Sequence, residues 1–98
     1  MNMTSSEVFK ARITFIEEQY EHVLDDVVRR PDLQMHNSDG NWVTYLDLPF
    51  CITKSVAQWA INFFGEKKDT VKLVSIISGV SYSPEGEIKD ITRIELEF

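Results

Sequence analysis

The sequence predicts an α+β fold in which a long N-terminal helix and a shorter second helix pack on an antiparallel sheet of three to four strands. Three observations predict it. An amphipathic helical pattern fills the N-terminal third, a second one lies near the middle, and branched or aromatic runs are separated by turn-forming residues. The predicted order of elements is α-β-β-α-β-β. No linker or internal repeat interrupts the 98 residues, so we expect a single domain, 1–98.

The first helix is expected to begin near Thr4 or Ser5 and to run for about 25 residues. Thr4 and Glu7 have the spacing of a capping box, which satisfies free amides at a helix start. The pair Arg29–Arg30 suits the negative C-terminal end of the helix, and Pro31 ends it. The apolar stripe of this helix follows spacings of three and four and consists of Phe9, Ile13, Ile16, Tyr20, Val23, Leu24 and Val27.

A hairpin is expected to follow the loop-rich segment 31–41. The turn Asp39–Gly40 suits a tight connection between a short strand, Leu33–His36, and a longer one, Trp42–Leu48. Pro49 ends the longer strand, because proline cannot donate a hydrogen bond to a neighbouring strand.

The second helix is expected to begin at Ser55, which has capping-box spacing with Gln58, and to end before Gly65 as the C′ residue. Its apolar stripe consists of Val56, Trp59, Ala60 and Phe63. The large aromatic side chains expected in the core are Trp42, Tyr45, Trp59, Phe63 and Phe64.

Two further strands complete the predicted sheet. The run Val71–Tyr82 is apolar enough for a central strand, with Gly79 as a bulge position. The turn Ser83–Gly86 then leads to a last strand that ends with Arg93–Phe98. Strict alternation there turns Ile94, Leu96 and Phe98 inward. The outward charges, Glu95 and Glu97 among them, suit an edge strand, because charges discourage edge-to-edge pairing.

Composition limits the classes of function. With 16 acidic and 10 basic residues the net charge is −6, which disfavours direct nucleic-acid binding and docking on anionic membranes. A single cysteine excludes an internal disulfide, and the N-terminal residues lack the pattern of a secretory signal. We therefore expect a cytoplasmic protein whose partners are basic macromolecules or small ligands.

Residues for catalysis or metal binding are sparse. His22, His36 and Cys51 are the only histidines and the only thiol, and they form no recurrent zinc-ligand spacing. Glu18 and His22, four residues apart, fit an exposed helix pair better than a metal site. Cys51 ends an apolar strand, where a small buried thiol is more typical than a nucleophile. Glycine-rich phosphate loops are absent from the sequence. We expect no cofactor, no metal and no enzymatic activity.

The most informative feature is acidic. The segment Ile13–Val28 holds five carboxylates and no lysine or arginine. Its row Glu17, Glu21, Asp25 lies on one helix face, where like charges at i, i+4 cost a little stability. The row is either a solvated outer face or a recognition surface for a basic partner. Phe15 lies off the apolar stripe, either as an exposed anchor or under the 31–41 loop. The candidate partner-binding residues are Phe15, Glu17, Glu18, Glu21, His22, Asp25 and Asp26.

This character favours a small inhibitory binding protein. Immunity proteins, which protect a bacterium by covering the basic active site of a nuclease toxin, are typically small, acidic and without chemistry of their own. One alternative is a phage or mobile-element inhibitor that mimics nucleic acid. Another is a ligand-binding or enzymatic α+β domain with a pocket between helix and sheet. A last one is an oligomeric structural or accessory subunit, in which either the apolar stripe of the first helix or an open sheet edge pairs between copies. The pocket alternative would use His36, Asp39, Tyr45, Asp47 or Cys51.

Overall fold

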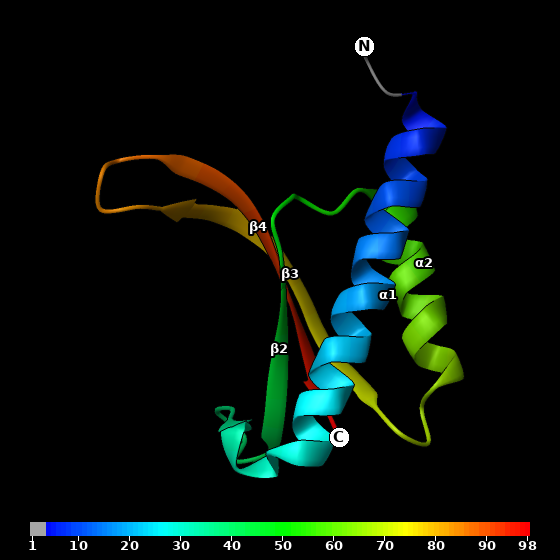
Figure 1. Ribbon diagram of the computed structural model, residues 1–98, viewed down its shortest axis with the longest axis vertical. Coiled ribbons are helices and arrows are strands. Elements are labelled where there is room, and N and C mark those ends of the chain that lie inside the picture. The colour runs from blue at the N-terminus through cyan, green and yellow to red at the C-terminus, as the bar shows by residue number, and fades with distance from the viewer. Residues whose placement is uncertain (1–3) are drawn as a thin grey trace.

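The computed structural model describes residues 4–98, and its architecture confirms the predicted α+β fold and element order. A two-layer arrangement places both helices on one face of a four-stranded antiparallel sheet with strand order β1-β2-β4-β3 (Figure 1). The elements are α1 (Ser5–Arg29), the 3-10 turn η1 (Pro31–Leu33), β1 (Met35–His36), β2 (Trp42–Leu48), α2 (Lys54–Glu66), β3 (Lys72–Tyr82) and β4 (Ile88–Glu97).

Local capping sets the limits of α1. The Thr4 hydroxyl accepts a hydrogen bond from the Glu7 amide at 3.1 Å and donates one to the Glu7 carboxylate at 3.1 Å. The predicted start is therefore confirmed, although the carboxylate bonds to the hydroxyl instead of the Thr4 amide. The helix ends at Arg29, and Pro31 opens η1, as the fixed φ of proline favours.

The predicted limits of α2 are wrong at both ends. The N-cap is Thr53, not Ser55, because the backbone at Thr53 is extended and its hydroxyl accepts from the Val56 amide at 3.3 Å. At the other end Gly65 lies inside the last turn, and the C-cap residue is Lys67. Gly65 lacks the positive φ that a C′ glycine adopts.

The predicted places of the last two strands in the sheet are also wrong. β4 lies between β2 and β3, and β3 forms an edge. The reason is burial: β4 contributes the fully buried Ile94 and Leu96, whereas much of β3 is exposed. The bulge interrupts the β3 register between Leu73 and Ser75, not at Gly79. The charges of β4 therefore do not guard an edge, and Glu95 instead accepts a hydrogen bond from Asn37 at 3.1 Å.

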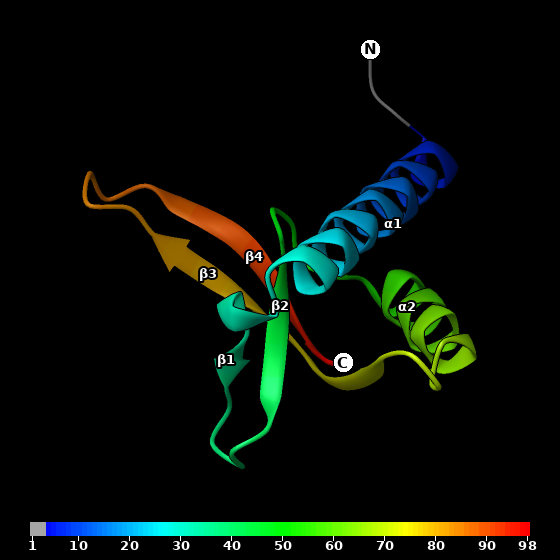
Figure 2. The ribbon, with the colours of Figure 1, turned by 60° about the horizontal axis from the view of Figure 1, so that its bottom comes forward.

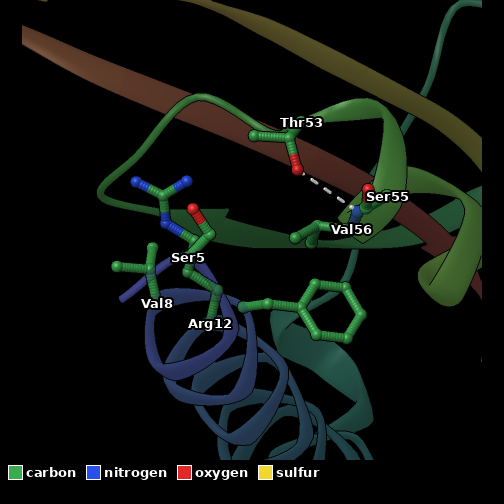
Figure 3. A pocket seen from close by; sticks show the side chains of 7 residues that line it. Ser5, Val8, Arg12, Thr53, Ser55 and Val56 are labelled. Atoms are coloured by element: carbon green, nitrogen blue, oxygen red, sulfur yellow. Dashed lines mark hydrogen bonds between the residues drawn. The ribbon is translucent and has the colours of Figure 1, made fainter. Parts of the chain in front are cut away.

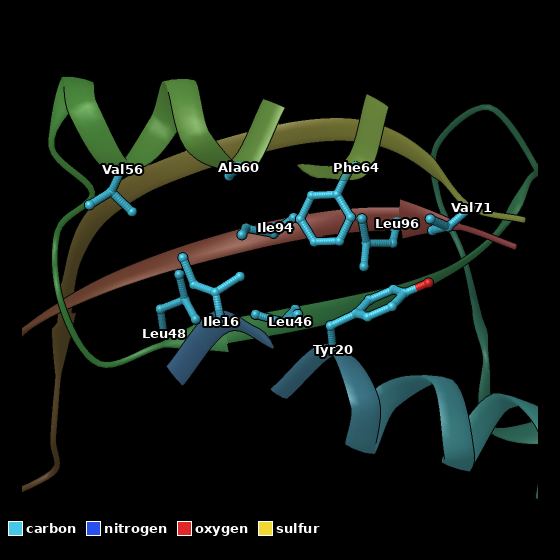
Figure 4. Close-up of a cluster of buried hydrophobic side chains, with 10 residues drawn as sticks. All are labelled: Ile16, Tyr20, Leu46, Leu48, Val56, Ala60, Phe64, Val71, Ile94 and Leu96. Atoms are coloured by element: carbon cyan, nitrogen blue, oxygen red, sulfur yellow. The ribbon is translucent and has the colours of Figure 1, made fainter. Parts of the chain in front are cut away.

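One hydrophobic core fills the space between the helices and the sheet (Figure 4). Tyr20 joins the two helices in this core, since its ring makes edge contacts with Phe63 at 5.6 Å and Phe64 at 5.5 Å between centroids. Phe98, just after β4, stacks on the same ring at 6.5 Å. The buried members of the core are Ile16, Tyr20, Leu46, Leu48, Val56, Ala60, Phe64, Val71, Ile94 and Leu96.

The other four aromatic residues expected in the core differ from Phe64, which is fully buried. Tyr45 is half-buried beneath Arg93 on the sheet face opposite the helices, so its predicted place in the core is wrong. Trp59 and Phe63 stack on each other at 4.8 Å and are half-buried at the rim of the core. Trp42 is 52% exposed, so its predicted place in the core is wrong. The β1–β2 hairpin extends past the helices (Figure 2), and the Trp42 indole packs instead against the ring of His36.

A buried hydroxyl network ties the segment after β2 to the sheet. Thr92 is fully buried, and its hydroxyl donates to the Phe50 carbonyl at 2.6 Å. The same oxygen accepts from the Ile52 amide at 3.1 Å and lies 2.7 Å from the Ser78 hydroxyl. Since residues 49–53 lead directly into α2, this network fixes where the second helix starts.

We expect the substitution Thr92→Val to lower the free energy of unfolding by roughly 1–3 kcal/mol, because the isosteric side chain leaves the buried Phe50 carbonyl without its donor. Urea denaturation followed by circular dichroism would measure the loss. The matched control is Thr14→Val, at an exposed position of α1, for which a change within ~0.5 kcal/mol is expected. Equal stabilities of the two variants would contradict the role of the network.

Candidate acidic recognition face

The outer side of α1 carries a continuous negative surface, here called the acidic face and made of Glu17, Glu18, Glu21 and Asp25. All four side chains are exposed, because the opposite side of the helix is held in the core by Ile16 and Tyr20. Residues four apart on a helix are separated by about 6 Å along the axis. The row is therefore a regular line of carboxylates on a rigid element.

The carboxylates of the acidic face have little local neutralisation. Asp25 forms an ion pair with Arg29 at 3.1 Å, between side chains that are more than half exposed. Such exposed pairs contribute little stability and are screened by salt. Within residues 4–98, Glu17, Glu18 and Glu21 form no ion pair. His22 is also exposed on this side of the helix.

Phe15 and Asp26 do not lie in the row. Phe15 is half-buried, and its ring meets the ring of Phe50 edge-on at 5.9 Å. It therefore packs against the core, which differs from both an exposed anchor and a position under the 31–41 loop. Asp26 is exposed but lines a small hollow beside Gln34 and Thr44, toward the start of the sheet.

A second hollow, of about 350 Å³, lies between the starts of the two helices (Figure 3). Arg12 reaches into it, and its guanidinium lies over the Phe50 ring at 4.9 Å. The cap residue Thr53 lines the same hollow. Arg12 was not among the site residues predicted from the sequence. Its spacing of four from Ile16, which places it beside the apolar stripe of α1, is the signal that could have indicated it.

The sheet face opposite the helices carries a polar cluster around Arg93. Its guanidinium donates to both carboxylate oxygens of Asp47, at 2.8 and 3.1 Å, and lies over the Tyr45 ring at 4.6 Å. The hydrogen bonds and charge of Asp47 raise the pKa of Arg93 further above its ordinary value. Asp47 is thus held as the ion-pair partner of Arg93.

Of the residues proposed for a catalytic or ligand pocket, Tyr45 and Asp47 come together, because both contact Arg93. Asp47 also lines a hollow with Lys89 and Asp90. His36 packs on Trp42 at the end of the β1–β2 hairpin. In the described part of the chain, no three histidine, cysteine or carboxylate side chains are grouped to hold a metal ion.

Cys51 is partly buried where residues 49–53 cross the sheet. Its thiol contacts the carbonyl oxygen of Gly79 at 3.7 Å. Removal from water raises the pKa of the Cys51 thiol, and the nearby carboxylate of Asp90 raises it further. A raised pKa lowers the thiolate fraction, which is the opposite of what a cysteine nucleophile needs.

Comparison with known proteins adds no relative: none of the family models, curated proteins or solved structures compared with this chain matches it. Among residues 4–98, neither helix combines the length and apolar character needed to cross a membrane. The candidate site therefore depends on geometry and charge alone.

We expect Cys51 to react slowly with iodoacetamide, with a pH midpoint above that of a free thiol, because burial and Asp90 both oppose ionisation. The substitution Asp90→Asn removes one of these causes and should move the midpoint toward lower pH. Alkylation rates measured by mass spectrometry across pH 7–10 would test this, with the urea-unfolded chain as the reference for an ordinary thiol. A midpoint for the folded protein below that reference would contradict the described environment.

Proposed function

We propose that this protein is an inhibitory binding protein of the immunity type, which neutralises a basic, nuclease-type toxin by covering its active site. The observation that supports the proposal most is the acidic face of α1, with its exposed carboxylates on a helix whose other side is buried. Net charge −6 adds to the attraction for a basic surface. In this proposal the protein acts by binding and carries no chemistry of its own.

The physical reason is charge complementarity. A nuclease presents lysine and arginine to hold phosphates, so a line of carboxylates can occupy the same surface. Complementary fields speed the encounter, and buried charge pairs slow the release of the complex. Because α1 is fixed by its buried stripe, the backbone that carries the carboxylates needs no ordering when a partner binds, and only the side-chain rotamers become restricted.

Phe15 has no part in this surface, since its ring packs on Phe50. The surface consists of Glu17, Glu18, Glu21 and Asp25, with His22 beside them and Asp26 at the margin.

The test begins with capture of binding proteins from a lysate of the native host, at low salt and at ~0.5 M salt, where exposed charge is screened. A captured basic protein is then assayed for nuclease activity with increasing amounts of this chain. We expect inhibition at equal stoichiometry, and at least ~100-fold weaker inhibition by the variant Glu17→Lys/Glu21→Lys/Asp25→Lys, because three attractive contacts become repulsive.

The matched control is Asp39→Lys/Glu66→Lys/Asp69→Lys, which makes the same change in net charge at exposed positions outside the acidic face. Inhibition that falls equally in both variants would contradict a local interface. If the captured protein instead binds DNA or RNA without cutting it, and nucleic acid competes with this chain, the function would be nucleic-acid mimicry. Capture of no basic protein would overturn the proposal.

A further inference from the structure

The β3–β4 hairpin extends well beyond the layer of helices (Figures 1 and 2). Because of this arm, the radius of gyration is 14.4 Å, whereas a compact domain of 100 residues has about 13 Å. Large apolar side chains are exposed along the arm, and four of them are at least half exposed. They are Ile77 at 65%, Val80 at 50%, Tyr82 at 67% and Ile88 at 63%.

The two edges of the sheet are protected very differently. β1 is two residues long, and a very short edge strand offers almost no template for pairing. β3 is 11 residues long and has no charged residue or proline after Lys72. Lysines, prolines and inward-pointing charges usually protect an edge strand from pairing with another chain. After Lys72, the protective feature of β3 is the bulge between Leu73 and Ser75. The long edge therefore presents a row of backbone groups ready to pair.

We propose that β3 is the interface of a symmetric dimer, in which the β3 strands of two copies of this chain pair antiparallel and join two sheets into one of eight strands. A second copy fits this edge because antiparallel pairing about a two-fold axis makes the edge complementary to itself.

The charges at the two ends of the arm are complementary in this arrangement. Antiparallel pairing brings the start of one β3 beside the hairpin tip of the other copy. At the start of β3 the exposed side chains of Lys68 and Lys72 lie near Glu66, Asp69 and Glu97, whereas the Lys67 ammonium lies over the Tyr20 and Phe63 rings. Carboxylates predominate at the tip, which carries Glu85, Glu87 and Asp90 with Lys89. Lys68 and Lys72 of one copy can therefore meet the tip carboxylates of the other copy.

The dimer is closed and leaves the acidic face free. Once the two β3 edges have paired, the remaining edges of the joined sheet are the two-residue β1 strands, so growth into a filament stops. The acidic face lies on α1, which packs over β2, whereas β3 lies at the other side of the sheet. The dimer is thus independent of the proposed function, and either can fail alone.

Sedimentation equilibrium of the purified chain tests the proposal. We expect a species of twice the 11.4 kDa chain mass at ~0.1 mM, and a dissociation constant at least ~100-fold higher for Ile77→Glu. Ile77 is the central residue of β3, so the two-fold axis places the new carboxylates against each other. In the monomer the change is compatible with folding, since the side chain is exposed and lies opposite Arg93.

The control is Leu33→Glu, which adds the same charge at a similarly exposed residue, 60%, at the opposite side of the sheet. It should leave the dimer intact. Hydrogen exchange should show that amides of β3 become more protected as the chain concentration rises. Monomer mass at ~0.1 mM for the wild type, equal effects of the two variants, or a dimer without added protection in β3 would each overturn the proposal.

Charge exchange gives a second test that does not depend on the apolar contacts. We expect Lys68→Glu/Lys72→Glu and Glu85→Lys/Glu87→Lys each to weaken the dimer roughly tenfold, because every altered contact occurs twice about the axis. Mixing the two variants should restore a heterodimer, in which both ends of the interface again bring opposite charges together. Circular dichroism checks that both variants fold, and failure of the mixture to associate more tightly than either variant alone would overturn the antiparallel arrangement.

Discussion

The ring of Tyr20 joins both helices and the sheet, and the arrangement of the helical layer depends on it. Its contacts with Phe63, Phe64 and Phe98 bring α1, α2 and the end of β4 to one point. Burial raises the pKa of the Tyr20 hydroxyl, and the Lys67 ammonium lies over the ring at 5.5 Å. Because one side of α1 is fixed in this way, its opposite side must face water. The orientation of the acidic face is thus a consequence of core packing, whatever surface it meets.

The sheet has a different constraint, because its central strand comes last in the sequence. β4 pairs with both β2 and β3, so β3 has no strand partner, and β2 has only the two-residue β1, until the C-terminal residues are in place. The hydroxyl of Thr92 then couples this strand to residues 49–53 through the Phe50 carbonyl and the Ile52 amide. The start of α2 is fixed by the same strand that completes the sheet. The arm beyond Thr92 has no such support from the helical layer, and its apolar residues remain exposed.

Local signals in the sequence were sufficient to predict which helices and strands form, but not which strands lie next to each other in the sheet. Thr4 and Pro31 mark the ends of α1 because capping and the fixed φ of proline act within a few residues. Thr53 and Ser55 offer nearly the same capping signal, and contacts of Ile52 with Ser78 and Thr92, which are distant in sequence, decide between them. The order of β3 and β4 also depends on non-local pairing. For the candidate site, the row of carboxylates was predictable from helical periodicity. The partial burial of Phe15 was not, because its ring is covered by Phe50, and no local sequence pattern indicates where Phe50 lies.

Two surfaces of this chain, the outside of α1 and the edge of β3, are left unburied by the packing of the core. One is charged, since the outside of α1 faces water along its whole length, and carboxylates keep that side soluble. The other is a nearly neutral strand edge, where backbone groups and apolar side chains are exposed together and solvation is least favourable. A charged face is well solvated while the chain is unbound, so it can remain exposed until a partner binds. An edge of 11 residues whose single charge is Lys72 cannot, because unpaired backbone groups beside exposed apolar side chains favour aggregation unless they are covered. Pairing of the edge in every copy and use of the acidic face only when a partner is present are therefore the two roles that agree with their chemistry.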